Sequence, residues 1–384
     1  MHVPDGFINA PVSAVAGVVA AGAVAVSLRG ARRELDERTA PLAGLVAAFI
    51  FAVQMLNFPV AAGTSGHLLG GALAAILVGP CTGVLCLSVV LLMQGILFAD
   101  GGLTALGVNI TIMGVITSVV GYAVFRGLVT VLPRKRRSVT VSAFVAALVS
   151  VPAAAAAFTL VYAIGGTTDV PIGSVLTAMV GVHVLIGIGE AAITAATVGA
   201  VIAVRPDLVH GARGLTAPLK LRVNGELVDA PAAGPTPAPG PTPAAGPTPA
   251  AGPTPAAGPT PAPGPTPAPV AARSPRRLIL AGLGVSLLLA GVVSFYASAS
   301  PDGLEKVAAD KGIDAKAEDH AAADSPLADY GVEGLTDARM SGGLAGVIGV
   351  GVTVVAGTGV FWSVRRRRTG EGDATSPTSV PENA

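Results

Sequence analysis

The feature that most limits how this chain can fold is a series of long apolar runs separated by short polar breaks. A run of about 17–25 apolar residues is long enough to cross a bilayer as a helix. Charged residues make up only 12% of the 384 residues, against about 25% in soluble domains. An ordinary soluble enzyme is therefore excluded, and the sequence predicts an all-α, polytopic membrane helix bundle. The expected spans lie near 11–28, 41–58, 81–99, 103–125, 139–163, 174–204, 278–297 and 343–362.

A further apolar segment, 66–79, is short, and it is either a short span or part of a re-entrant hairpin with 81–99. Lys and Arg concentrate in the short cytoplasmic loops of membrane proteins. All basic clusters fall on one side if 66–79 spans or if the hairpin re-enters, and Met1 then faces outward. The C-terminus is then cytoplasmic. The basic clusters are 29–38, 126–137, 205–222, 273–277 and 365–368.

The chain divides at a proline-rich repeat. Residues 234–269 repeat Gly-Pro-Thr-Pro-Ala-x six times, a composition typical of an extended polyproline-II tether. We therefore predict a linker at 230–271 that joins a first domain of about seven spans, 1–229, to a second module, 272–368. This module has two spans that enclose a polar outer loop. Residues 369–384 are predicted to be a disordered tail.

The N-terminus carries a candidate metal chelate. It has no basic region and opens on a polar turn, so we expect no cleaved signal peptide. With His2 second in the chain, the Met1 amine, the His2 amide nitrogen and the His2 imidazole can close fused rings around one metal. Such an all-nitrogen set favours square-planar Ni(II) or Cu(II) over Mg or Ca. The alternative is that His2 is a polar residue at an interfacial N-terminus.

His67 is the candidate for a fourth nitrogen ligand. It lies in a Gly- and hydroxyl-rich segment between two apolar runs, and irregular backbone at membrane depth requires burial in protein or a cavity. Together with Met1 and His2 it would complete a four-coordinate site. The alternative is a polar loop that caps the next helix. Three nearby polar side chains are candidates for orienting the ligands: Asn57, Thr64 and Ser65.

Other polar residues near or within the spans admit several interpretations. His183 and Glu190 lie on one helix face about two turns apart, and ionisable groups in a span suggest a function. Docking to a partner, an internal hydrogen bond and metal transit all remain open for this pair. Asp100 either caps the next helix or guides a cation inward. Cys81 and Cys86 are expected to pack as small hydrophobic residues.

Four segments of the chain resemble the CbiM/NikM family, the substrate-capture components of energy-coupling-factor transporters for cobalt and nickel. They are Met1–Phe7, Asn57–Gly71, Phe98–Asn109 and His183–Ala191. The resemblance implies that the N-terminus threads back into the bundle and that Met1, His2 and His67 bind the metal. It does not decide between Co(II) and Ni(II), although the all-nitrogen set favours Ni(II).

The second module carries its own signature. Its segment Pro301–Glu305 resembles the PDGLE module, which is similar to the accessory CbiN/NikN subunit. Together the two resemblances imply a multi-pass protein of a prokaryotic plasma membrane. The implied partners are membrane lipid, a transmembrane coupling (T) subunit and a pair of cytoplasmic ATPases, and the metal is substrate with no organic cofactor.

Several other functions are disfavoured by the sequence. The net charge of +1 gives no basic field for nucleic acid. The sequence has neither a phosphate-binding Gly-x-x-x-x-Gly-Lys-Ser/Thr loop nor a His-Glu-x-x-His motif, so we predict a transport component that is not itself an ATPase or another enzyme. The remaining alternative is an ATP-independent divalent-metal channel or secondary transporter, which inverted repeats would support. The apolar spans contain no such repeat.

Overall fold

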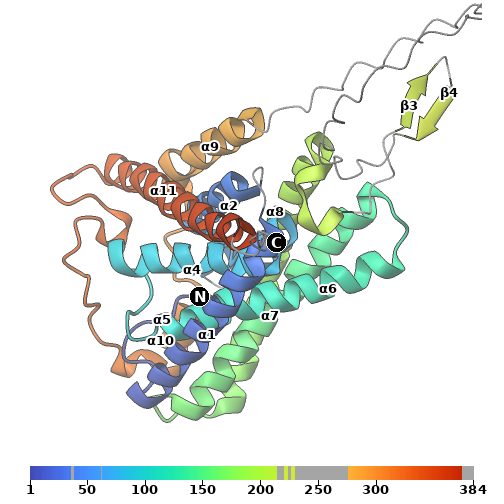
Figure 1. Cartoon of the computed structure of the whole chain (residues 1–384). Helices are drawn as coiled ribbons and strands as arrows, with labels where there is room; N and C mark the ends of the chain where they lie inside the picture. The colour runs from blue at the N-terminus through green and yellow to red at the C-terminus, as the bar shows by residue number, and fades with distance from the viewer. Residues whose placement is uncertain (36–38, 62, 214–219, 224–225, 230–275, 374–384) are drawn as a thin grey trace, which may run out of the picture. The chain divides into compact units, whose positions relative to one another are not determined.

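A computed structural model describes residues 1–35, 39–61, 63–213, 220–223, 226–229 and 276–373. This part of the chain is built almost entirely from helices (Figure 1). The linker predicted at 230–271 lies outside the described residues, and so does 374–384 of the expected tail. The last helix runs to Asp373, beyond residue 368, after which we expected that tail to begin.

Two stretches of the chain, Met1–Thr216 and Pro275–Ala384, form one structural unit. The helices of the first stretch are α1 (Ala10–Glu34), α2 (Thr39–Gln54), α3 (Gly71–Val78), α4 (Pro80–Leu97), α5 (Leu106–Asn109), α6 (Thr117–Val131), α7 (Arg136–Gly165) and α8 (Ile172–Val204). Those of the second are α9 (Arg276–Gly291), α10 (Gly303–Lys311) and α11 (Ala338–Asp373). A π-helical turn, Ile110–Ile116, joins α5 to α6.

The few strands form two antiparallel hairpins. Strands β1 (Phe58–Ala61) and β2 (Thr64–Gly66) pair in the first hairpin, which lies between α2 and α3. Strands β3 (Lys220–Val223) and β4 (Glu226–Asp229) pair in the second, which belongs to a separate unit. Short 3-10 turns complete the described elements: Pro206–Leu208, His210–Ala212, Val293–Tyr296, Ile313–Lys316 and Ala328–Tyr330.

Seven helices of the described part are long and apolar enough to cross a membrane. Five come from the first stretch of the unit and two from the second. They are Ala10–Glu34, Pro80–Leu97, Leu106–Val131, Arg136–Gly165, Ile172–Val204, Arg276–Tyr296 and Ala338–Arg366. The prediction of an all-α, multi-pass bundle with a two-span C-terminal module is therefore confirmed.

The remaining two apolar segments form shorter helices than predicted. Helix α2 ends at Gln54, short of the expected residue 58, where Pro59 disfavours helix and strand β1 begins. Helix α3 has 8 residues and is too short to cross a bilayer alone. The expected segment 66–79 is thus non-helical backbone followed by a short helix. Gly70, with a φ of 87°, provides the left-handed turn that starts this helix.

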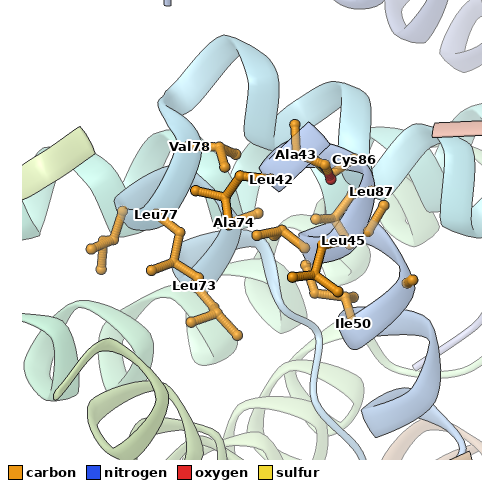
Figure 2. Close-up of a cluster of buried hydrophobic side chains, with 14 of the residues drawn as sticks. Leu42, Ala43, Leu45, Ile50, Leu73, Ala74, Leu77, Val78, Cys86 and Leu87 are labelled. Atoms are coloured by element: carbon orange, nitrogen blue, oxygen red, sulfur yellow. The ribbon is translucent and has the colours of Figure 1, made fainter. Parts of the chain in front are cut away.

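Helices α2, α3 and α4 meet in a buried apolar core (Figure 2). Every residue of α3 is buried, so this helix has no face left for lipid. Cys86 packs among these side chains, and its thiol donates to the Ala43 carbonyl at 3.4 Å. The expectation of a small hydrophobic role therefore fits this cysteine. The labelled core residues are Leu42, Ala43, Leu45, Ile50, Leu73, Ala74, Leu77, Val78, Cys86 and Leu87.

The two long helices of the second module pack against α2 (Figure 1). Small residues allow the close approach: a Cβ on Gly346 would lie 2.5 Å from the Ala290 carbonyl oxygen and 3.0 Å from the side chain of Met55. Close packing through small residues is how helices associate where lipid removes the hydrophobic driving force. The module is therefore docked on the first domain by its helices.

Glu34 joins the end of α1 to the start of α4. Its carboxylate accepts hydrogen bonds from the Cys81 amide at 3.1 Å and from the Thr82 amide and hydroxyl, each at 2.7 Å. It thus satisfies amides that the first turn of α4 cannot pair internally.

We predict that Glu34→Ala destabilises the bundle by about 1–3 kcal/mol, the cost of leaving such donors without an acceptor. Thermal unfolding in detergent measures this loss. Glu34→Gln keeps one acceptor oxygen and should lose clearly less. Equal stability of the alanine variant and the parent would contradict this account of α4.

Candidate metal site

The first nine residues are not loose but are threaded into the bundle, as the family resemblance implies. Met1 is 2% exposed, and Val3 and Phe7 are also buried. Asn109 clamps Val3 on both sides: its side-chain oxygen accepts from the Val3 amide at 2.8 Å and its nitrogen donates to the Val3 carbonyl at 3.1 Å. The clamp lies at the junction of α5 with the π-helical turn, a feature common at functional positions.

Three further contacts fix the path of this segment. The Asp5 carboxylate accepts from the Leu103 and Thr104 amides at 3.2 and 2.8 Å. The Thr167 hydroxyl donates to the Gly6 carbonyl at 2.6 Å. Asn9 then caps α1 by accepting from the Val12 amide at 3.0 Å. The chain end is therefore positioned by its own hydrogen bonds and by burial.

The terminal nitrogen of Met1 lies 2.6 Å from Nε2 of His67. The other ring nitrogen of His67 is 3.1 Å from the Leu68 carbonyl. A carbonyl only accepts, so Nδ1 carries the proton and Nε2 presents its lone pair toward the chain end. The ring of His2 lies beside that of His67, with 5.1 Å between centroids. The three residues predicted as ligands, Met1, His2 and His67, are therefore adjacent.

The backbone around His67 is held from the neighbouring helix α8. The Glu190 carboxylate accepts from the Leu69 amide at 2.6 Å and from the Gly70 amide at 3.1 Å. Of the roles left open for this residue, the structure places Glu190 in an internal hydrogen-bond network. This buried carboxylate fixes the loop that carries His67 at the start of α3.

Two carboxylates pair with the chain end. Asp302, in the outer loop of the second module, forms an ion pair with the Met1 ammonium, and its Oδ2 is 3.5 Å from His67 Nε2. Burial raises the pKa of Asp302, but the charge of the adjacent Met1 ammonium outweighs it and holds that pKa well below its usual range.

Asp100, just after α4, accepts a hydrogen bond from Nδ1 of His2. It also accepts from the Tyr330 hydroxyl at 2.5 Å. Burial raises its pKa, whereas His2 and Tyr330 lower it, with a net pKa of about 2. Asp100 is therefore an ionised hydrogen-bond partner of His2, one of the predicted ligands.

The site also contains nitrogen atoms without hydrogen-bond partners. Nε2 of His2 and Nε2 of His183 are buried and unpaired in the described part of the molecule. His183 donates from Nδ1 to the Met179 carbonyl at 2.7 Å, so its Nε2 also carries a lone pair. His183 lies close to Met1, His67 and Asp302, around a gap too small to hold a water molecule. A larger cavity of about 600 Å³ reaches His2, His67, Asp100 and Asp302.

This donor set suits a late first-row metal substrate better than Mg or Ca, because neutral imidazole and amine nitrogens predominate. Within the described residues, no three His, Cys, Asp or Glu side chains are arranged to hold a metal by themselves.

The three residues expected to orient the ligands are dispersed. Asn57 lines the larger cavity, with its side-chain oxygen buried and unpaired among the described residues. Thr64 is buried in β2. Ser65 faces the second module and donates from its hydroxyl to the Ser300 carbonyl at 2.7 Å. Of these three, Ser65 anchors the module loop instead of the imidazole.

The sequence analysis did not identify Asp302, Tyr330 or Asn109 as site residues. Asp302 and Asn109 lay inside motifs that carried the family resemblance, yet no local pattern indicated that either touches the chain end. Asp302 and Glu305 have the Asp-x-x-Glu spacing of a capping box, and the structure shows that this box starts α10. The contacts across the sequence could not be derived from spacing.

Comparison with known proteins agrees with this architecture. Residues 2–208 match the family model CbiM, described as the cobalt uptake substrate-specific transmembrane region, and residues 276–366 match the PDGLE domain. The bundle and these two regions define a membrane component of cobalt and nickel transport. The chain belongs to the CbiM family and carries a C-terminal PDGLE domain.

Individual relatives each match part of this chain. A Haloquadratum walsbyi protein, provisionally named a metal transport protein, is 39% identical over 209 residues, which is 54% of this chain and 93% of the relative. The fused nickel transport protein NikMN of Rhodobacter capsulatus is 42% identical over 125 residues, 33% of this chain and 36% of the relative. The cobalt transport protein CbiM of Geobacter sulfurreducens is 34% identical over 218 residues, which is 54% of this chain and 61% of the relative.

Among solved structures, a truncated transition metal transporter matches with a TM-score of 0.47 and 28% identity. The match covers 53% of this chain and 99% of that structure.

We predict that Asn109→Leu loosens the N-terminal segment, because it removes both hydrogen bonds to Val3. At about 1 kcal/mol per bond, hydrogen exchange of the Val3 amide should accelerate by about tenfold or more. Thr111→Val is the matched control, since the Thr111 hydroxyl bonds only within its own helix, to the Gly107 carbonyl at 2.8 Å. Unchanged exchange in the leucine variant would contradict the clamp.

Proposed function

We propose that this chain is the substrate-binding membrane component of an ATP-driven energy-coupling-factor importer for divalent nickel or cobalt. The observation that carries the proposal is the buried Met1 nitrogen 2.6 Å from His67 Nε2, with His2 alongside. The donors would be the Met1 amine, the His2 amide nitrogen, the His2 imidazole and His67 Nε2. Their metal is the transported substrate, and no organic cofactor is involved.

Binding would require one local rearrangement. Fused chelate rings through the His2 amide use Nδ1 of the same residue, and Asp100 holds that atom in this structure. The His2 ring therefore has to turn from Asp100 toward the Met1 amine when the metal enters. His67 Nε2 already faces the chain end, so its loop can stay in place.

The surrounding polar residues would support this site. Glu190 would keep the loop that carries His67 in position, and Asp100 would hold the His2 ring before the metal arrives. His183, Asn57, Thr64 and Ser65 would line the approach or anchor the outer loop. We assign the metal-binding domain to 1–229, the linker to 230–271, the PDGLE module to 272–368 and the tail to 369–384.

Energy would come from other proteins. The sequence contains no phosphate-binding loop, so a T subunit and a pair of cytoplasmic ATPases would drive release of the metal inward. The positive clusters support an outward Met1 and a cytoplasmic C-terminus in a prokaryotic plasma membrane. Nickel and cobalt both occur in the names of relatives, and a planar four-nitrogen site favours nickel.

The decisive experiment measures Ni(II) and Co(II) binding by calorimetry on the purified full chain. We expect loss of high-affinity binding in His67→Ala and in a variant with three residues added ahead of Met1. Three residues are chosen because a single added residue would place the histidine third, where the chain end could supply four nitrogens by itself. His210→Ala, far from the chain end in a 3-10 turn beside Tyr122, is the control and should bind normally.

Full affinity in the extended variant would exclude the chelate. Metal uptake by cells that lack the ATPases would instead support an ATP-independent channel or secondary transporter.

We also predict that affinity falls as the pH is lowered from 8 to 6. The amine, the amide and the imidazoles must all be deprotonated to bind metal. Each proton released on binding contributes about tenfold per pH unit to the apparent affinity, as linkage requires. Calorimetry in buffers of different ionisation enthalpy counts these protons. Binding that is independent of pH would show that these nitrogens are not the ligands.

A further inference from the structure

The outer loop of the PDGLE module enters the site through one side chain. Asp302 is 8% exposed and pairs with the Met1 ammonium, which is itself buried. Burying a charge is costly unless a partner of opposite sign compensates it. A chain end that carries its proton can therefore stay inside the bundle because the module supplies this carboxylate.

The two carboxylate oxygens of Asp302 have different partners. Oδ1 accepts from the Leu304 and Glu305 amides at 2.7 and 2.9 Å and so caps α10. The Glu305 carboxylate accepts from the Asp302 amide at 2.8 Å and completes the capping box. Oδ2 remains for Met1 and His67. The helix thus fixes the carboxylate rigidly, with one oxygen directed at the chain end.

The loop that carries Asp302 is bound to the first domain on both sides of the site. The Ser298 amide donates to the Asn57 carbonyl at 2.7 Å, and the Ser65 amide donates to the Pro301 carbonyl at 2.8 Å. On the other side, Leu304 and Val307 of α10 are buried in the same apolar cluster as Met1. The carboxylate is therefore placed by the first domain as well as by its own helix.

From these contacts we propose that Asp302 is a positioning residue, through which the PDGLE module holds the chain end in its metal-binding place before the metal arrives. This inference rests on the proposed function, since it assumes that Met1 and His67 are ligands. The charge balance also fits. A divalent metal bound to one deprotonated amide carries a net charge of +1, the same as the ammonium it replaces, so Asp302 can neutralise both states.

The test uses the full chain and two substitutions that keep the helix cap. Asn and Ser are good N-cap residues, so Asp302→Asn and Asp302→Ser remove the charge but retain α10. Asp310→Asn is the matched control, because Asp310 lies on the same helix and pairs with Lys306 at the surface. Mass spectrometry of the N-terminal peptide first verifies that Met1 is the first residue of the protein.

Two readouts separate positioning from a general structural role. In the metal-free protein, acylation of the Met1 amine should be at least about tenfold faster in both Asp302 variants, since breaking a buried ion pair leaves the charge uncompensated. In stopped-flow measurements with Ni(II), association should slow by a similar factor, whereas dissociation changes little. Asp310→Asn should match the parent in both readouts.

Each other outcome overturns the inference. An amine as protected as in the parent, with unchanged association, would show that Asp302 does not position the chain end. Faster association of Ni(II) with the variants would show that Asp302 hinders metal entry. Faster dissociation of Ni(II) would show that Asp302 is itself a metal ligand. Failure of the proposed function is distinguishable, because the parent would then bind no Ni(II) or would bind it equally well with residues added ahead of Met1.

Discussion

A chain end with a positive charge lies buried among apolar helices, and much of the surrounding structure compensates for that burial. The Met1 ammonium meets the Asp302 carboxylate and the lone pair of His67. Val3 pairs with the Asn109 side chain and the Gly102 amide, and the Asp5 carboxylate accepts from the Leu103 amide. Without these partners the buried ammonium and backbone groups would be unpaired, and unpaired polar groups are costly in an apolar interior. The N-terminal segment is therefore part of the packed core of the bundle.

The same constraint explains the irregular backbone in the middle of the bundle. His67 can reach the chain end because residues 64–66 form a strand, residues 67–70 are non-helical and α3 starts late, at Gly71. Non-helical backbone at this depth leaves amides without partners, and Glu190 accepts two of them from α8. The second module closes the remaining side, where its outer loop bonds to Ser65 and Asn57. The second module thus contributes contacts to the site itself.

Much of the fold could be predicted from the sequence, because bilayer-length apolar runs and basic clusters are local patterns. The five long helices of the first stretch and the two of the module were all expected. The short α3 was ambiguous, since an apolar run of that length is compatible with several backbones. At the site, Met1, His2 and His67 were singled out by their chemistry and by family resemblance. Asp302 and Tyr330 were missed, because contacts across more than two hundred residues leave no local signature.

We propose that the chain end and His67 together surround the transported metal with nitrogen ligands. X-ray absorption at the nickel edge, on the full chain loaded with one equivalent of Ni(II), would show this coordination shell. We expect a planar, four-coordinate shell of nitrogen atoms that includes two imidazoles. A six-coordinate shell dominated by oxygen would contradict it, and so would a spectrum with no imidazole contribution.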